Sequence, residues 1–229
     1  MKEKTVVVTG AARGIGKATA DLFASRGCHI ARLDFQPGEG ILTCDVTDES
    51  AVDGVFEKIG KIDILVNNAG IAIRKNAFDI TAEEWDKVLD VNLRGLFLCS
   101  RAAARRMKAH GGGAIVNLAS IMGFSGGLFP NPAYQASKGA VVNLTRALAL
   151  EFAPFNITVN AVAPTFVRTD LTTPIFSSPE LLKKVMDHTP LGRLPEAEDI
   201  AQAILFLASP AARCITGVTL PVDSGYLAR

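Results

Sequence analysis

The sequence has almost no net charge and no long apolar run. Its 24 Lys and Arg residues nearly balance 23 Asp and Glu residues, for a formal net charge of +1. This balance does not favour nucleic acid or an anionic membrane surface as a partner. The apolar runs are shorter than the roughly 20 residues of a membrane-spanning helix, and the N-terminus lacks the long apolar region of a signal peptide. We therefore expect a soluble cytoplasmic protein with no nucleic-acid or membrane partner.

Cysteine is scarce, and its spacing does not indicate a metal site. The chain has 4 cysteines and 3 histidines, with no Cys-x-x-Cys motif and no histidine at metal-ligand spacing. We predict that no metal is bound. The thiols stand far apart in apolar contexts and are expected to be reduced core residues: Cys28, Cys44, Cys99 and Cys214.

One basic cluster lies near the end of a predicted helix, just before a run of glycines. It consists of Arg101, Arg105, Arg106 and Lys108. Cations in the last turns of a helix complement the helix dipole. We interpret the cluster in this way rather than as a nucleic-acid site.

Short β-branched runs alternate with helical patterns along the 229 residues, of which 48% are hydrophobic. Such a chain can bury a sizeable core, and fully apolar runs are typical of parallel strands buried on both faces. We predict a single α/β domain over residues 1–229, Rossmann-like and doubly wound, with a mostly parallel seven-stranded sheet and helices on both faces. The predicted strands span 5–8, 28–33, 41–44, 62–66, 114–118, 158–162 and 218–222, and the main helices span 17–26, 48–59, 82–108, 134–153 and 196–208.

A glycine-rich turn joins the first strand to the first helix. Glycines let the backbone turn tightly and approach a pyrophosphate, and the N–H groups at the start of the helix can donate to it. The spacing differs from Gly-x-Gly-x-x-Gly, and glycine-rich turns also end ordinary strands. The order of strand, turn and helix nevertheless favours a dinucleotide cradle, with Gly10, Arg13, Gly14, Ile15 and Gly16 as cofactor-binding residues.

Asp34 ends the second predicted strand, about where an acidic residue meets an adenosine ribose. A carboxylate there accepts hydrogen bonds from the 2′ and 3′ hydroxyls and repels a 2′-phosphate, so NAD is predicted and NADP is less favoured. Arg13 and Arg32 would instead favour NADP, because either could reach a 2′-phosphate. The connection 35–40 is too short for a crossover helix, and we expect a loop there.

Polar residues follow the next strands at the same edge of the sheet. Asp45 and Val46 could flank an adenine with a carboxylate and an apolar wall, although Asp45 is equally well read as a turn or cap residue. Residues 67–70, Asn-Asn-Ala-Gly, suit the crevice in which such sheets bind ligands, with a strand-terminating turn as the alternative. Ser120 follows the strand 114–118. Asn92 interrupts an apolar helix face and is either a satisfied core amide or a residue aimed at the site.

Tyr134 and Lys138 are four residues apart on a predicted helix and therefore project from one face. An ammonium about 4 Å from a phenol contributes about 4 kcal/mol, or roughly three pKa units, at an effective dielectric constant of about 20. The phenol would then titrate near neutrality and could serve as a general acid or base. The alternative is an ordinary surface pair of Tyr and Lys.

Together these motifs resemble the short-chain dehydrogenase/reductase family, in its single-domain branch, over the whole length of the chain. Residues 9–16 match its Thr-Gly-x-x-x-Gly-x-Gly loop, 67–70 its Asn-Asn-Ala-Gly stretch and 134–138 its Tyr-x-x-x-Lys pair. Ser120 and Asn92 fall at the family's other catalytic positions.

The resemblance implies a role for each of these residues. Ser120 holds the substrate oxygen, Tyr134 transfers the proton, Lys138 lowers the tyrosine pKa and binds the nicotinamide ribose, and Asn92 anchors a proton-relay water. Further cofactor contacts are implied at Asn68, Gly70, Val167 and Thr169. The chain departs from the family pattern in a longer spacing between Ser120 and Tyr134, and in Thr165 and Ser224 where glycines are usual. These departures bear on the substrate more than on catalysis.

The segment 165–190 is rich in Thr, Ser and Pro, with a short helical piece near 181–186, and has the composition of a substrate lid. Pocket candidates are apolar or polar side chains around it: Met122, Phe124, Phe129, Phe166, Ile175, Phe176, Arg74, Thr172 and Ser177. The helices 82–108 and 134–153 are apolar almost all round and need a second partner. We expect a homotetramer or homodimer through them.

The leading functional hypothesis is an NAD-dependent oxidoreductase of a secondary alcohol or ketone, such as a sugar acid, polyol or hydroxy acid, with Tyr134 as general acid and base. One alternative is an NADPH-dependent reductase of a 3-oxoacyl or other ketone substrate. An alternative of another class is a regulatory protein that binds the nucleotide without turnover.

Overall fold

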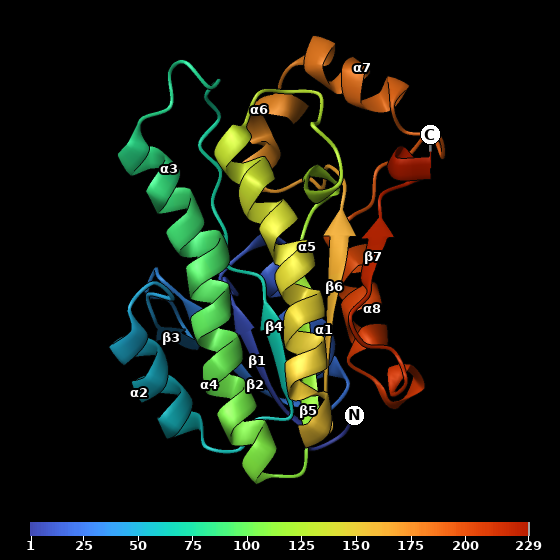
Figure 1. The fold of residues 1–229 in the computed structure, drawn as a ribbon. Helices are drawn as coiled ribbons and strands as arrows, with labels where there is room; N and C mark the ends of the chain where they lie inside the picture. The colour runs from blue at the N-terminus through green and yellow to red at the C-terminus, as the bar shows by residue number, and fades with distance from the viewer. Residues whose placement is uncertain (229) are drawn as a thin grey trace.

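A parallel β-sheet runs through the middle of the molecule in a computed structural model that describes residues 1–228 (Figure 1). Within these residues seven strands pair in the order β3-β2-β1-β4-β5-β6-β7. Every pairing is parallel, so the sheet is wholly rather than mostly parallel. The strands are β1 (Thr5–Thr9), β2 (His29–Asp34), β3 (Ile41–Thr43), β4 (Ile64–Asn67), β5 (Gly113–Leu118), β6 (Ile157–Pro164) and β7 (Thr219–Val222).

Helices cover both faces of this sheet, as predicted. The helices α1 and α8 lie on one face, and α2, α4 and α5 lie on the other, with α3 leading into α4 (Figure 1). The short α6 and α7 lie beyond the carboxyl ends of the strands. Their bounds are α1 (Gly14–Ser25), α2 (Glu49–Ile59), α3 (Ala82–Leu89), α4 (Leu96–Ala109), α5 (Pro132–Phe152), α6 (Thr173–Phe176), α7 (Pro179–Asp187) and α8 (Ala197–Leu207).

The alternation of side chains along β1 separates two cores. Val6 and Val8 pack with Phe23 of α1 and Ile204 of α8, whereas Val7 packs on the opposite face with residues of α2, α4 and α5. All three valines are fully buried. A strand with both faces covered has no polar side, which explains the uninterrupted apolar run in the sequence.

The strand order reverses between β1 and β4, where the chain leaves β3 and returns to the other side of β1. Loops that follow the carboxyl ends of the two strands diverge at such a switch point and leave a crevice. The glycine-rich turn after β1 and the Asn-Asn-Ala-Gly stretch after β4 both lie there. The fold therefore brings the two predicted ligand-binding motifs together.

The predicted helix 82–108 contains a π-helical segment, Asp90–Gly95, between α3 and α4. Thr81 and Glu84 form the predicted capping box at its start, with bonds of 3.2 and 3.1 Å. A π segment adds one residue to a helical turn and rotates the side chains that follow it. Gly95 in this segment packs so closely on Val46 that an added Cβ would lie 2.7 Å from Val46 Cγ2.

Other predicted boundaries shift for local reasons. The helix predicted to open at Tyr134 begins at Pro132, a residue suited to the first turn because it lacks an N–H. The connection 35–40 contains no helix, as expected. The predicted lid has more structure than one short helix, because it holds a 3₁₀ turn at Asp170–Thr172 as well as α6 and α7.

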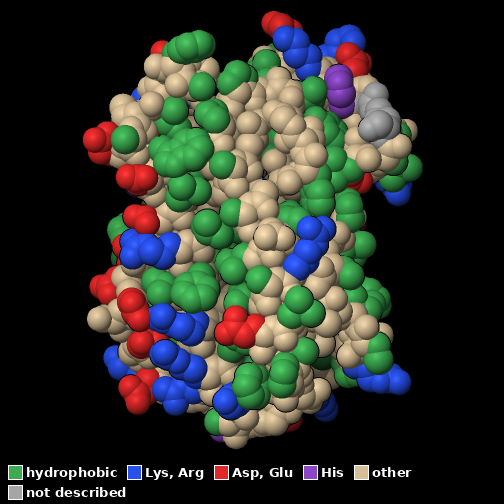
Figure 2. All heavy atoms as spheres, in the orientation of Figure 1, with side chains coloured by type: hydrophobic (Ala, Val, Ile, Leu, Met, Phe, Trp, Pro, Cys, Tyr) green, Lys and Arg blue, Asp and Glu red, His purple; other side chains and the backbone are tan. Residues whose placement is uncertain are grey.

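The three arginines of the basic cluster pair with α2, while Arg106 and Lys108 also lie in the last turn of α4, as the dipole interpretation expected. Arg101 pairs with Glu49, Arg105 with Asp53 at 3.8 Å, and Arg106 with Glu57 at 3.9 Å; Lys108 lies 4.0 Å from the ring centre of Phe155. Figure 2 shows these blue and red side chains interleaved over α2 and α4. The dipole interpretation missed these pairings, which depend on tertiary packing.

The cysteine prediction holds for Cys44 and Cys99, which are buried, but it is wrong for Cys214, which is exposed; Cys28 is partly buried. Among residues 1–228 no helix is long and apolar enough to cross a membrane. The same residues contain no cluster of three or more His, Cys, Asp or Glu side chains that could hold a metal ion.

Candidate active site

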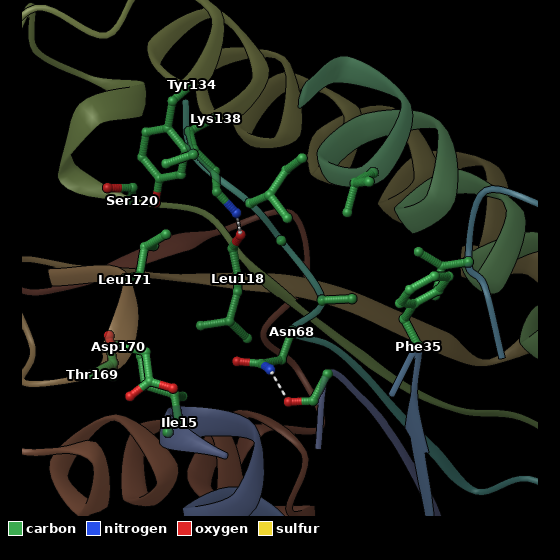
Figure 3. A pocket seen from close by; sticks show the side chains of 18 of the residues that line it. Ile15, Phe35, Asn68, Leu118, Ser120, Tyr134, Lys138, Thr169, Asp170 and Leu171 are labelled. Carbon is green, nitrogen blue, oxygen red and sulfur yellow. Dashed lines mark hydrogen bonds between the residues drawn. The ribbon is translucent and has the colours of Figure 1, made fainter. Parts of the chain in front are cut away.

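A cleft of about 1100 Å³ opens at the carboxyl ends of the strands (Figure 3). It runs from Asp34 at one end, past the glycine-rich turn, to Tyr134 and Lys138 at the other. Nearly all of the predicted cofactor and catalytic residues line it: Gly10, Arg13, Gly14, Ile15, Asp34, Asp45, Val46, Asn68, Gly70, Ser120, Tyr134, Lys138, Val167 and Thr169. Two predicted residues, Gly16 and Asn92, do not.

The glycine-rich turn depends on backbone shapes and contacts that exclude side chains. Gly10 and Gly14 have positive φ angles of 63° and 55°, which residues with a Cβ seldom adopt. A Cβ at Gly16 would lie 2.1 Å from the Gly10 carbonyl oxygen. Gly16 therefore lets the helix approach the turn; it does not line the cleft, and its contact with the cofactor stays a prediction. The Asn68 amide braces the turn by donating to the carbonyls of Gly10 (2.9 Å) and Thr9 (3.0 Å).

The start of α1 is open to an anion. Its N-cap residue Arg13 makes no side-chain capping bond, and the first turn holds no acidic residue. Backbone N–H groups at the start of a helix then lack partners, and the positive end of the helix dipole points into the cleft. These features fit the pyrophosphate of a dinucleotide.

Asp34 lies at the end of the cleft opposite Tyr134 and Lys138, where the adenosine of a cofactor is predicted to bind. Its carboxylate accepts from the backbone N–H groups of Ala12 (3.0 Å) and Gln36 (3.1 Å), which fix its position and leave further lone pairs free. Phe35, which the sequence did not single out, also lines this end and is 69% exposed. An aromatic ring beside the ribose position is a suitable surface for an adenine to stack on. In the sequence, the position of Phe35 directly after Asp34 was the only indication of this role.

Asp45 is both a turn residue and part of the cleft wall. Its carboxylate accepts from the Thr47 backbone N–H at 2.9 Å and from the Thr47 hydroxyl at 2.7 Å. Val46 is buried at the wall and packs on Gly95. The two readings of Asp45 are therefore compatible, because the same turn shapes the wall of the cleft.

Tyr134, Lys138 and Ser120 converge at the other end of the cleft (Figure 3). The first two lie in the opening turns of α5, and Ser120 follows β5. A hydrogen bond joins Ser120 to the Tyr134 phenol. The Lys138 ammonium donates to the Leu118 carbonyl at 2.6 Å and lies 5.6 Å from the centre of the Tyr134 ring. Lys138 is 4% exposed, so its charge is held inside the cleft rather than on the surface.

The pKa of Tyr134 departs from the expected direction. Burial raises the pKa of the phenol above its ordinary value, and the Ser120 hydrogen bond and the charge of Arg74 oppose this only in part. Burial also lowers the pKa of Lys138, to about 8. The expectation that Lys138 brings the phenol to neutrality is wrong for this arrangement, because the ammonium is directed at the Leu118 carbonyl and the phenol is desolvated.

Asn92 is a fully bonded core amide. Its oxygen accepts from the Ile71 N–H at 2.8 Å, and its nitrogen donates to the Ile71 carbonyl at 2.9 Å and the Ser137 hydroxyl at 3.0 Å. It is 1% exposed. Both polar atoms of the side chain thus have partners, and the implied role of Asn92 as the anchor of a proton-relay water stays a prediction. Asn92 fixes the loop after β4 to the helix that carries Tyr134.

Comparison with known proteins agrees with this geometry. Residues 10–227 match the family model described as enoyl-(acyl carrier protein) reductase. The chain is 41% identical to the NAD-dependent glycerol dehydrogenase of Listeria innocua, over 98% of this chain and 94% of that protein. It is 37% identical to the 2-dehydro-3-deoxy-D-gluconate 5-dehydrogenase of Dickeya dadantii, over 100% and 97%. The chain belongs to the short-chain dehydrogenase/reductase family.

Solved structures of this family share the whole fold. A Beutenbergia cavernae protein provisionally assigned as an NAD(P)-dependent gluconate 5-dehydrogenase, with NADP bound at low occupancy, has a TM-score of 0.95 and 37% identity, over 100% of this chain and 98% of that one. The protein is therefore an oxidoreductase of the short-chain dehydrogenase/reductase family that acts on CH–OH groups.

A smaller cavity of about 70 Å³ adjoins the cleft on the far side of Tyr134. The dehydrogenase lines it with six of the predicted pocket residues: Arg74, Met122, Phe129, Phe166, Thr172 and Ile175. Three other candidates do not line it. Phe124 is exposed, Phe176 stacks under the Arg168 guanidinium at 4.4 Å, and Ser177 ends α6. Asn131 and Thr165 also line the cavity, and sequence reasoning did not name them as pocket residues.

Proposed function

We propose that the protein is an NAD-linked dehydrogenase that moves a hydride between a nicotinamide cofactor and a secondary alcohol or ketone. The observation that carries the proposal is the position of the Ser120 and Tyr134 hydroxyls, which line both the long cleft and the small cavity. A carbinol held in the cavity would meet these hydroxyls at the boundary with the nicotinamide end of the cleft. The substrate classes proposed are sugar acids, polyols and hydroxy acids.

Each residue at this boundary has a distinct task. The cofactor, when bound, supplies or accepts the hydride. Ser120 donates a hydrogen bond that holds the substrate oxygen, and Tyr134 gives a proton to that oxygen in reduction or takes it in oxidation. Lys138, whose pKa is about 8, is cationic at neutral pH and would favour the phenolate as it forms. The apolar walls exclude water and strengthen these interactions.

NAD is supported by the charges around Asp34. Arg32, one candidate partner for a 2′-phosphate, pairs with Asp21 at 2.6 Å. Arg13, the other, lies 3.2 Å from Asp170 of the lid segment. With both arginines facing carboxylates, the fixed Asp34 carboxylate is the dominant group at the ribose position, and it repels a 2′-phosphate.

An NADPH-dependent ketone reductase is the second candidate. It is favoured by the bound NADP in two structural neighbours, from Beutenbergia cavernae and Agrobacterium tumefaciens. A regulatory protein without turnover is the third. Two kinds of assay separate the three candidates. In the first, glycerol, galactitol, gluconate and cyclopentanol are supplied with NAD, and the absorbance of the reduced cofactor is measured. In the second, the corresponding ketones are supplied with NADH and NADPH. Turnover with NAD supports the proposal, turnover with NADPH alone supports the reductase, and no turnover supports the regulatory protein.

A homodimer or homotetramer through α4 and α5 remains part of the proposal. Most apolar residues of α5 are buried within the chain itself, but Leu150 is 81% exposed, and Phe97 of α4 is 37% exposed. Figure 2 shows apolar side chains scattered over this face. Light scattering after size exclusion should give a mass of two or four chains, and Leu150→Glu should reduce it. A monomeric wild type would contradict this part of the account.

A further inference from the structure

The small cavity beyond Tyr134 contains one charged group, Arg74. Among the described residues that line the cavity, no other is charged. Within residues 1–228 the Arg74 guanidinium has no ion pair or hydrogen bond, whereas its neighbour Lys75 pairs with Glu84 at 2.6 Å. The Arg74 charge acts on the Tyr134 phenol, whose pKa it lowers. A cation without a carboxylate partner therefore stands beside the reacting position.

Two buried polar atoms of the same cavity also lack partners. They are the amide oxygen of Asn131 and the hydroxyl oxygen of Thr165. Both residues are 9% exposed. A buried polar atom without a hydrogen bond is costly, typically about 1–3 kcal/mol, and native proteins seldom leave one without a reason. Neither oxygen touches solvent, so a ligand hydroxyl can bond to them only where the two side chains turn toward the cavity that they line.

The remaining walls set the shape of the ligand. Phe129 and Phe166 contact edge to face with ring centres 6.1 Å apart, and Met122 and Ile175 add further apolar surface. Arg74 itself is exposed, so its charge stays partly solvated beside these walls. The cavity thus combines one cation, unpartnered hydrogen-bonding groups and the two reacting hydroxyls.

We propose that this cavity is a subsite for the carboxylate of a polyhydroxy acid, so that the substrate is a sugar acid anion rather than a neutral polyol. This inference rests on the proposed function. The Arg74 guanidinium takes the carboxylate with two parallel N–H bonds, a geometry that arginine supplies and lysine does not. Asn131 and Thr165 take hydroxyls of the chain between the carboxylate and the reacting carbon.

The reaction leaves the carboxylate unchanged. In oxidation the carbinol C–H bond breaks and its electron pair leaves with the hydrogen to NAD⁺, while the O–H proton passes to the Tyr134 phenolate. The products are a keto acid, NADH and the phenol. The opposite direction returns both hydrogens. Arg74 is thus a specificity-determining residue that binds a part of the substrate that does not react.

The test compares C6 aldonates with the alditols that carry a CH₂OH group in place of the carboxylate, such as gluconate with glucitol and galactonate with galactitol. With NAD, kcat/KM should be higher for an aldonate than for its alditol. Arg74→Gln should lower kcat/KM for the aldonate by roughly 10- to 100-fold, mainly through KM, and for the alditol by much less, because the alditol loses only the effect of the Arg74 charge on the Tyr134 pKa. Arg74→Lys should restore only part of the loss. Lys75→Gln, which removes an adjacent charge already paired with Glu84, should leave the preference unchanged.

A second variant distinguishes a loss of substrate binding from an effect of the Arg74 substitution on folding. Asn131→Asp has the same shape and places a negative charge in the cavity, so it should lower kcat/KM for the aldonate selectively. Equal or better turnover of alditols by the wild type, or equal losses on both substrates in Arg74→Gln, would overturn the subsite. Failure of every alcohol and ketone with either cofactor would instead overturn the proposed function, so the two failures are distinguishable.

Discussion

At Tyr134 two effects act on the phenolic proton in opposite directions. Burial raises its pKa, and the Ser120 hydrogen bond and the Arg74 charge lower it, with burial the larger effect. A phenol with a raised pKa stays protonated at neutral pH and is ready to act as an acid in ketone reduction. Oxidation of an alcohol needs the phenolate, which becomes abundant only as the pH approaches the raised pKa.

We therefore expect kcat/KM for alcohol oxidation to rise with pH from about 7 to about 10. Ser120→Ala removes the hydrogen bond that lowers the Tyr134 pKa, so its rise should move to higher pH, with a rate at least about tenfold lower at neutral pH. The measurement is the pH profile of NAD reduction. Ser125→Ala, whose hydroxyl accepts only from the Gly127 N–H at 3.1 Å, is the control. A flat profile, or a shift to lower pH in Ser120→Ala, would contradict this account.

The carboxylate of Asp34 is expected to set the cofactor preference. Asp34→Asn keeps the shape and hydrogen-bond acceptor that face Ala12 but removes the charge that repels a 2′-phosphate. The ratio of kcat/KM for NAD to that for NADP should fall at least about tenfold, because a like-charge contact costs more than about 1.4 kcal/mol. Steady-state kinetics with both cofactors measures the ratio. Glu39→Gln, a carboxylate of the same loop outside the cleft, should leave the ratio unchanged; an unaltered ratio in Asp34→Asn would rule out this role.

The residues of the site could be predicted from motif spacing, but their interactions could not. The four-residue spacing correctly places Tyr134 and Lys138 on one helix face, because helical geometry is local. The sign of the tyrosine pKa shift depends on burial and on the direction of the Lys138 ammonium toward Leu118, which are set by tertiary packing. The same applies to Arg74, whose lack of a partner appears only in three dimensions.

Among the elements, the π segment Asp90–Gly95 is tied to the site through Asn92. We predict that Asn92→Ala lowers the free energy of unfolding by about 2 kcal/mol or more, because it removes three hydrogen bonds, two to the backbone of Ile71 and a buried one to the Ser137 hydroxyl. Urea denaturation measures the change. Asn143→Ala, at an exposed position of α5, should cost well under about 1 kcal/mol. Equal stability of the two variants would show that the Asn92 contacts are not needed.

The prediction of elements succeeded where local signals decide and failed where distant contacts do. The capping box at Thr81 and the apolar periodicity located the start of α3 and the length of the helical region. The π segment escaped prediction because no local signal marks it, and the bonds that its Asn92 makes to Ile71 and Ser137 join residues far apart in sequence. The pairing of α4 arginines with α2 was missed for the same reason.

Across the whole molecule, the parallel sheet explains why short motifs spread over most of the chain meet in one cleft. Parallel strands end at the same edge, and the reversal of strand order between β1 and β4 opens a crevice there. The alternation of short apolar runs with helical patterns along the chain was enough to predict this parallel sheet. The substrate could not be predicted in this way, because the small cavity is assembled from loops and a lid whose packing no periodic pattern describes.

The central claim is that Tyr134 transfers the proton while the rest of the cleft binds the cofactor. Tyr134→Phe removes one oxygen atom and should abolish turnover, by at least about 1000-fold in kcat, while the dissociation constant for NADH, measured by fluorescence titration, stays within about threefold of wild type. Tyr226→Phe, at the only other tyrosine of the chain, should retain turnover. Normal turnover in Tyr134→Phe would contradict the account.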